Sequence, residues 1–236
     1  MVSWPRTLRP KVVLVALAFT YLQASGSAAH CSNMAFRIVK TLVLAGSGSI
    51  GDNWTSIPFI SPYRTVADFC AKTGLVAFNA STGTPGATVT VIDPGTGTPS
   101  IGTCGTASAS SVLLVPGWGI KIRQPNVTGA RTKIVIVGAH DPALRISVSK
   151  KRTSGAADTV GYWFSVPPNT TAVTYGNLCH QVGITTSQGG FVRIDPSTGA
   201  VQIYGCTTLA ETTKLTSGEA VEVLVGTPRS FTPGVY

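Results

Sequence analysis

An internal duplication constrains this chain more than any other feature, because both copies must fold on one plan. The stretch from Asp52 to Phe59 reads DNWTSIPF, and the stretch from Gly161 to Pro168 reads GYWFSVPP. Both contain the pattern Trp-x-Ser-aliphatic-Pro. The residues that match at an offset of 109 are Trp54 and Trp163, Ser56 and Ser165, Pro58 and Pro167, Thr65 and Thr174, and Cys70 and Cys179.

The duplication extends on both sides of this pattern. Residues 35–38 (AFRI) match residues 143–146 (ALRI) at an offset of 108. Further along, IDPGTG from Ile92 matches IDPSTG from Ile194, and Cys104 matches Cys206, at an offset of 102. We therefore predict two β-rich repeats after a leader of residues 1–29. The first repeat comprises residues 30–142 and the second repeat comprises residues 143–236.

The composition indicates a mostly β fold. Only 11% of the residues are charged, and few windows show the 3.6-residue spacing of a long amphipathic helix. Short β-branched runs such as TVTVIDP and TKIVIVG lie between Gly, Pro and Asn residues, which is typical of strands joined by tight turns. The sequence predicts two tandem β-sandwich-like or barrel-like units, each with one short helix and one disulfide.

Each copy predicts the same order of elements. A strand with the Trp-Ser-Pro pattern comes first, and a short helix follows at residues 65–74 and 174–183, each ending in Gly. Asp93 and Asp195 then begin Asp-Pro-x-Thr-Gly turns, which join the two strands of a hairpin. A last strand closes each copy at residues 119–125 and 220–226.

The cysteines fit this duplication. Cys70, Cys104, Cys179 and Cys206 allow three pairings, and the duplication favours Cys70 with Cys104 and Cys179 with Cys206. Each bridge would close a loop of about 30 residues and contribute ~3–4 kcal/mol. No Cys-x-x-Cys spacing suggests zinc. Cys31 is left over, either as a free thiol or as a link to another chain.

The first residues have the layout of a secretory signal peptide. Arg6, Arg9 and Lys11 precede an apolar run over residues 12–22, and small residues follow it. Cleavage after Ala29 would leave a protein of the cell surface or the extracellular space, with no integral membrane segment. The net charge of the whole chain is +9, but it is thinly spread, with one cluster at residues 150–152. Nucleic-acid binders concentrate charge on one face, so we expect no nucleic acid as a partner.

Each copy resembles a repeat that is common in secreted and surface proteins of bacteria and archaea. That repeat has the pattern Trp-x-x-Ser-Leu-Pro, a short helix, an Asp-Pro-x-Thr-Gly hairpin, and Pro-Gly-x-Gly before a closing strand. The resemblance implies an adhesive, envelope or accessory protein and provides no catalytic residue. The matching residues are Trp54, Ser56, Pro58, Asp93, Pro94, Gly97, Pro116, Gly117 and Gly119, and then Trp163, Ser165, Pro167, Asp195, Pro196, Gly199 and Gly218.

Two further patterns suggest a cofactor or metal site, but each has less support in the sequence than the duplication has. Residues 46–51 spell G-x-G-x-x-G, but a dinucleotide site requires a helix that begins within the glycines, and here a turn and a strand are predicted. His30 would become the N-terminal residue after cleavage and, with His140 or His180, offers the ligands of a copper-dependent polysaccharide monooxygenase. The duplication explains the chain without copper, so we expect no cofactor, no metal and no catalytic residue.

The sequence predicts a secreted, non-enzymatic structural or adhesive protein. Its partner would be itself, in fibres built by strand addition, with residues 30–46 as the donated strand. The first alternative is a carbohydrate-binding accessory module in which Trp54 and Trp163 stack on sugars. In the main interpretation, these two residues are anchors of the core or between sheets.

Overall fold

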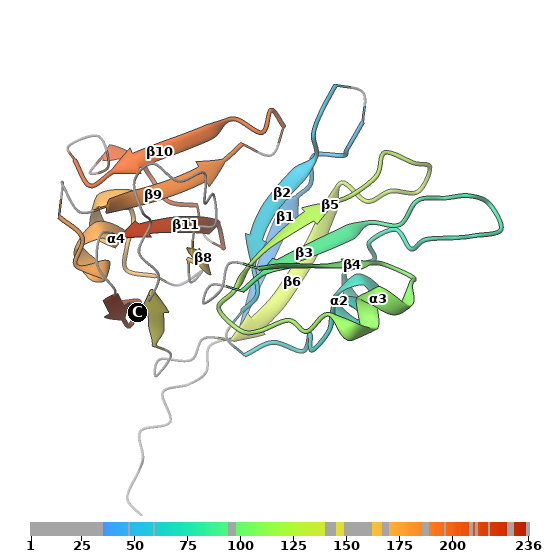
Figure 1. Cartoon of the computed structure of the whole chain (residues 1–236), viewed down its shortest axis with the longest axis horizontal. Helices are drawn as coiled ribbons and strands as arrows, with labels where there is room; N and C mark the ends of the chain where they lie inside the picture. The colour runs from blue at the N-terminus through green and yellow to red at the C-terminus, as the bar shows by residue number, and fades with distance from the viewer. Residues whose placement is uncertain are drawn as a thin grey trace, which may run out of the picture. The chain divides into compact units, whose positions relative to one another are not determined.

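Antiparallel β-strands are the main secondary structure of the computed structural model (Figure 1). It describes residues 35–46, 48–58, 60–93, 98–139, 145–148, 162–166, 170–185, 189–195, 197–207, 210, 212–216, 218–225 and 229–234. Residues Met34–Tyr236 form one compact unit. In chain order the elements are β1 (Ala35–Thr41), β2 (Asp52–Ser56), α2 (Val66–Thr73), β3 (Thr88–Ile92), β4 (Pro99–Thr103), α3 (Ala107–Ser111), β5 (Gly119–Arg123), β6 (Lys133–Ala139), β7 (Ile146–Val148), β8 (Tyr162–Ser165), α4 (Tyr175–Val182), β9 (Gly189–Ile194), β10 (Val201–Gly205), β11 (Ala220–Val225) and β12 (Arg229–Phe231).

Each repeat contains one four-stranded antiparallel sheet. The strand order is β2-β5-β3-β4 in the first repeat and β8-β11-β9-β10 in the second. The two sheets also share their register, so that corresponding residues form corresponding rows across the strands. These rows are Trp54, Lys121, Thr90 and Ile101, and Trp163, Glu222, Val192 and Ile203. The prediction of a mostly β chain with two β units is confirmed.

A two-stranded ribbon accompanies each sheet. β1 pairs with β6 along seven residues, and β7 pairs with β12 along three. The sequence suggested residues 30–46 as a strand for another chain, but Ala35–Thr41 already pair within the first repeat. The reason is that β6 contributes the buried residues Ile134 and Ile136 to the first core, and β1 completes the ladder beside them.

The two predicted helices form with matching caps. The Thr65 hydroxyl accepts a hydrogen bond from the Asp68 N–H, and the Asp68 carboxylate accepts from the Thr65 N–H, both at 3.2 Å. The hydrogen bond from the Arg64 N–H, with a further one from the Thr65 N–H, lowers the pKa of Asp68 in spite of the opposing effect of desolvation. In α4, Thr174 accepts from the Asn177 N–H in the same way. Both helices end at a glycine in the left-handed conformation, as the sequence predicted.

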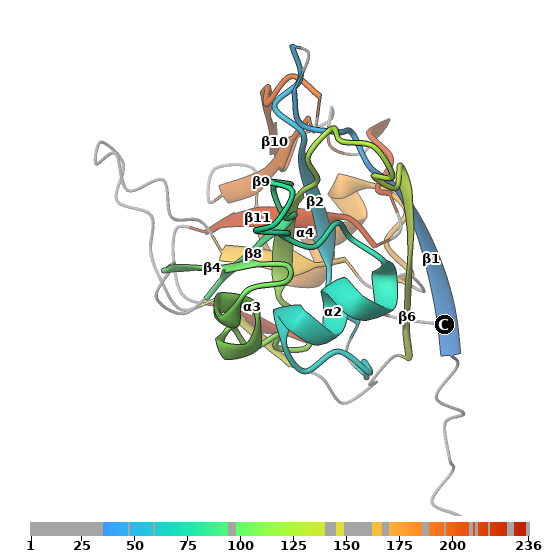
Figure 2. The same cartoon turned by 90° about the vertical axis from the view of Figure 1, so that its right-hand side faces the viewer.

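Each helix is fastened to its sheet by a disulfide. Cys70–Cys104 joins α2 to the end of β4, and Cys179–Cys206 joins α4 to the end of β10, with Cα–Cα distances of 5.7 and 5.9 Å. The predicted disulfide in each unit is therefore present. Figure 2 shows α2 and α3 side by side over the first sheet. The sequence did not predict α3, because its ASASS sequence has almost no apolar surface.

Candidate functional site

The repeated tryptophans stack on each other. The ring centroids of Trp54 and Trp163 lie 3.9 Å apart, and the ring planes differ by 12°. Their exposed fractions are 9% and 4%. Ala220 completes this buried cluster, and Ile92 and Ile194 pack against it. Stacked aromatic side chains typically contribute about 0.5–1.5 kcal/mol beyond the burial of their area, so the pair anchors one repeat to the other.

This placement bears on the carbohydrate alternative. An aromatic side chain that stacks on a sugar needs an open ring face. Trp54 and Trp163 instead use a ring face on each other, and the remainder of each side chain is almost fully buried. Their positions correspond to anchors between sheets and do not favour ligand stacking.

Other residues of the repeated motif meet at the same contact. The Thr55 and Ser56 hydroxyls each donate to the Gly218 carbonyl at 3.2 Å. Gly218 has a φ of +71°, and a Cβ there would lie 2.7 Å from Ile38 Cδ1, so a larger residue would be strained and crowded. Gly119 leaves room for the backbone and Cβ of Trp163. The Trp, Ser and Gly positions of the motif therefore build the contact between the repeats.

A charged group borders the tryptophan pair. Lys121 Nζ lies 3.1 Å from an Asp52 carboxylate oxygen and 5.7 Å from the centre of the Trp54 ring. Arg123 Nε donates to the other oxygen of Asp52 at 2.7 Å. Glu222 takes the register position of Lys121 in the second repeat and is 8% exposed. The cation near the Trp54 ring adds a favourable electrostatic interaction of the kind typical for Lys over aromatic faces.

A second polar group lies inside the second repeat. Arg193 Nε and Glu219 Oε1 are 2.7 Å apart, and the Glu219 side chain is 7% exposed. The other Glu219 oxygen accepts from the Thr216 N–H at 3.1 Å. Burial lowers the pKa of Lys40, and the charge of Glu219 partly opposes this. Burial also raises the pKa of Tyr175, with a further contribution from Glu219.

In this ionic group Glu219 is buried and Arg193 is partly exposed, and two tyrosines interact with Arg193. Tyr175 is fully buried and stacks on Tyr204 at 4.3 Å between ring centroids. Its hydroxyl has no hydrogen-bond partner of good geometry among the described residues. Sequence reasoning missed Arg193 and Glu219. The available signal was the duplication itself, since Arg193 corresponds to Val91 at the offset of 102.

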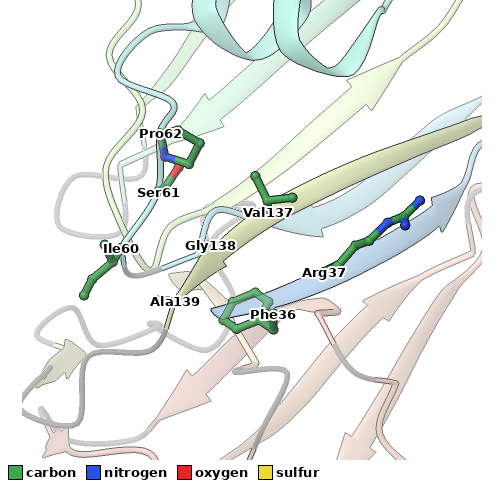
Figure 3. A pocket seen from close by; sticks show the side chains of 8 residues that line it. All are labelled: Phe36, Arg37, Ile60, Ser61, Pro62, Val137, Gly138 and Ala139. Atoms are coloured by element: carbon green, nitrogen blue, oxygen red, sulfur yellow. The ribbon is translucent and has the colours of Figure 1, made fainter. Parts of the chain in front are cut away.

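One surface groove lies at the start of the β1–β6 ribbon (Figure 3). Its volume is about 630 Å³. The lining is mainly apolar and includes one charged side chain, Arg37, which Figure 3 shows extending along β1. It has no carboxylate, His or Cys to act as acid, base or nucleophile. The lining residues are Phe36, Arg37, Ile60, Ser61, Pro62, Val137, Gly138 and Ala139.

Of the three histidines considered for copper binding, His30 and His140 lie outside the described residues, and His180 is exposed on α4. Cys31, predicted as a free thiol or a link to another chain, also lies outside them. Within the described ranges, no three His, Cys, Asp or Glu side chains gather as metal ligands would.

The glycine-rich loop and one glycosylation sequon also have structural explanations. Gly46 and Ser49 form a tight turn, and β2 follows at Asp52, so no helix begins within the glycines. Asn53 begins an Asn-x-Thr sequon but is fully buried, and its side chain bonds to the N–H and C=O of Val43. A glycan cannot attach there in the folded protein.

No helix among the described residues is both long and apolar enough to cross a bilayer. Comparison of the chain with protein-family models, with curated proteins and with solved structures gave no match. The resemblance to the repeat of bacterial and archaeal surface proteins therefore stays a prediction. The stacked tryptophans, the hydroxyl contacts to Gly218 and the two disulfides describe a scaffold made from two copies of one unit.

Proposed function

We propose that this protein is a secreted, non-enzymatic structural or adhesive component of the cell surface or extracellular matrix, and that its copies self-assemble by strand addition. One observation carries this proposal. The side chains that the duplication singles out hold the structure together, as the tryptophan stack, the hydroxyl bonds to Gly218 and the disulfides do.

The disulfides support the proposed location. Structural disulfides persist in oxidising compartments and are rare in the cytosol. Two bridges, one in each repeat, suit a chain that leaves the cytosol through the predicted leader of residues 1–29. The same bridges stabilise small units with limited cores, which suits a durable extracellular part.

The sheets support the proposed mode of assembly. Open β-sheets end in strands whose outer N–H and C=O groups are free to pair with another chain. Among the described residues, each four-stranded sheet ends in a strand that pairs on one side only, β4 in the first sheet and β10 in the second. A chain built from two such sheets has the geometry that strand addition requires.

Negative-stain electron microscopy of the secreted protein over a concentration series tests this proposal. We expect oligomers or filaments whose number increases with protein concentration. Uniform single particles at every concentration would contradict self-assembly. Binding of those particles to insoluble polysaccharides, unchanged by Trp54→Phe, would then favour an adhesive module that uses a surface other than the tryptophan pair.

A further inference from the structure

The edge strands β4 and β10 differ in how many outward backbone N–H and C=O groups are left without a hydrogen bond. In β4, Pro99 has no N–H, and the Thr103 N–H donates to the Ser108 hydroxyl at 3.1 Å. The Thr103 carbonyl accepts from Thr106. Only Ile101 is left on this edge with both a free N–H and a free C=O among the described residues, so β4 is a poor partner for another strand.

β10, at the corresponding edge of the second sheet, is open. Ala200 accepts from the Asp195 N–H, so alternation directs the N–H and C=O groups of Gln202 and Tyr204 to β9 and those of Val201 and Ile203 outward. No described residue bonds to the outward groups of Val201 and Ile203. Their side chains are 60% and 61% exposed. Figure 1 shows β10 at the outer edge of its sheet.

β10 carries no charged residue, and in this it differs from β1, another edge strand. Among the described residues β1 is also unpaired on its outer side, but it carries the exposed Arg37, and such a charge keeps edge strands apart. The outer side of β6 is closed by Ile60, which exchanges both backbone hydrogen bonds with Ala139. β10 reads VQIYG and has no charge and no proline. In a basic chain, an uncharged edge lets two copies approach with little repulsion.

We propose that β10 is the docking strand for a second copy of this chain, paired antiparallel with the β10 of that copy. In the register centred on Gln202, Val201 exchanges both hydrogen bonds with Ile203 of the partner subunit, and Ile203 does so with the partner's Val201. The same register places these aliphatic side chains in contact on one face. The contact joins two four-stranded sheets into one continuous sheet.

The contact is small, because each β10 offers five residues. Small interfaces of this kind belong to the weak, concentration-dependent class. The dimer is thus expected to dissociate on dilution. A two-fold contact of this kind closes on itself, so a longer assembly would add a second contact elsewhere. The pairing presupposes the self-assembly proposed above and specifies the strand and register that begin it.

The duplication offers a matched pair of variants. Ile203→Lys places a charge on the open edge, and Ile101→Lys places the same charge at the corresponding position of the closed edge. Both side chains are more than half exposed, so both variants should fold, which urea unfolding checks. We expect sedimentation velocity to show a concentration-dependent dimer for the unmodified chain and for Ile101→Lys. Ile203→Lys should raise the concentration needed for dimers at least tenfold.

Cross-linking tests the register. Gln202→Cys, in a Cys31→Ser background, brings two thiols opposite each other across the two-fold axis, where non-hydrogen-bonded Cα atoms lie about 4.5 Å apart. A disulfide across that pair is feasible. The matched control is Ser100→Cys, which occupies the corresponding position on β4. We expect a covalent dimer from Gln202→Cys alone under mild oxidation, seen by non-reducing electrophoresis.

The outcomes separate this contact from the proposed function. Dimers that persist in Ile203→Lys, or equal cross-linking of the two cysteine variants, would overturn the β10 contact and leave self-assembly through another surface standing. A chain that stays monomeric at all concentrations, with no cross-link from Gln202→Cys, would overturn both. Loss of dimers in Ile203→Lys together with the selective cross-link would establish the contact.

Discussion

The two repeats share a frame but differ in the interior of their sheets. Where the first repeat has Val66, Val91, Gly102 and Trp118, the second has Tyr175, Arg193, Tyr204 and Glu219. Backbone hydrogen bonds fix the last of these matches, since the Ile57 N–H donates to the Trp118 carbonyl and the Val166 N–H donates to the Glu219 carbonyl. At these four positions the first repeat is apolar, whereas the second contains an ion pair and two tyrosines.

This difference shows which parts of the repeat specify the fold. The threonine at each helix start, the glycine at each helix end, the disulfide and the strand order are the same in both copies. The interior differs between the copies, and a buried ion pair is often replaceable by apolar residues of similar volume. Stability should therefore differ between the repeats, with the second repeat opening first.

The disulfides give the largest expected effect on this comparison. Replacing Cys179 and Cys206 with Ala, or Cys70 and Cys104 with Ala, should each lower the free energy of unfolding by ~3–4 kcal/mol. The closed loops span 27 and 34 residues, so the two losses should be nearly equal. The second repeat already contains the ionic interior. Without Cys179–Cys206, its peptides should therefore exchange amide hydrogens earlier than the peptides of the first repeat do without Cys70–Cys104. The reverse order in hydrogen exchange with mass spectrometry would contradict this ranking.

The ion pair gives the next largest effect. Glu219→Gln leaves Arg193 and Lys40 without their counter-charge, and we expect a loss of about 1–3 kcal/mol, reduced from that of a fully buried pair because Arg193 is partly exposed. The control is Lys121→Gln in the first repeat, which should cost less than about 1 kcal/mol because Asp52 keeps its bond to Arg123. Urea unfolding measures both.

The combined variant Arg193→Val with Glu219→Leu makes the second interior resemble the first. It should lose less stability than Glu219→Gln, because only Lys40, and no longer Arg193, is left without its counter-charge. A double variant that is less stable than the single one would mean that the ion pair itself, and not the cost of an orphaned charge, stabilises the second repeat.

The smallest effect is in the hairpin turn. Hydrogen bonds from the Ser197 hydroxyl and from the Thr198 and Ser197 N–H groups lower the pKa of Asp195 to about 2. Because this pKa is lower in the folded protein, the contribution to stability is present above the unfolded value of about 3.9 and is lost as the pH falls toward 2. Carboxyl NMR titration should show this low value, and Ser197→Ala should move it upward. An unchanged pKa in Ser197→Ala would contradict the assigned cause.

Much of the frame was predictable from the sequence, since caps, turns and cysteines are local signals that the duplication repeats. Thr65 with Asp68, Gly74 and the Asp195 turn are such cases. The pairing of β1 with β6 was not predictable, because it joins residues about 100 apart in sequence and strand partners depend on the whole fold. The stacking of Trp54 on Trp163 was not predictable for the same reason. Each was expected to be an anchor, but the sequence around neither residue specifies which side chain it contacts.

The account rests on the repeated tryptophans being a structural pair, and circular dichroism tests this directly. Two indoles stacked at 3.9 Å should give an exciton couplet in the far-ultraviolet spectrum of the folded protein. We predict that Trp54→Phe and Trp163→Phe each abolish the couplet, whereas Trp118→Phe retains it. A couplet that survives either of the first two changes, or a folded wild-type protein without one, would contradict the claim that the duplicated motif joins the two repeats.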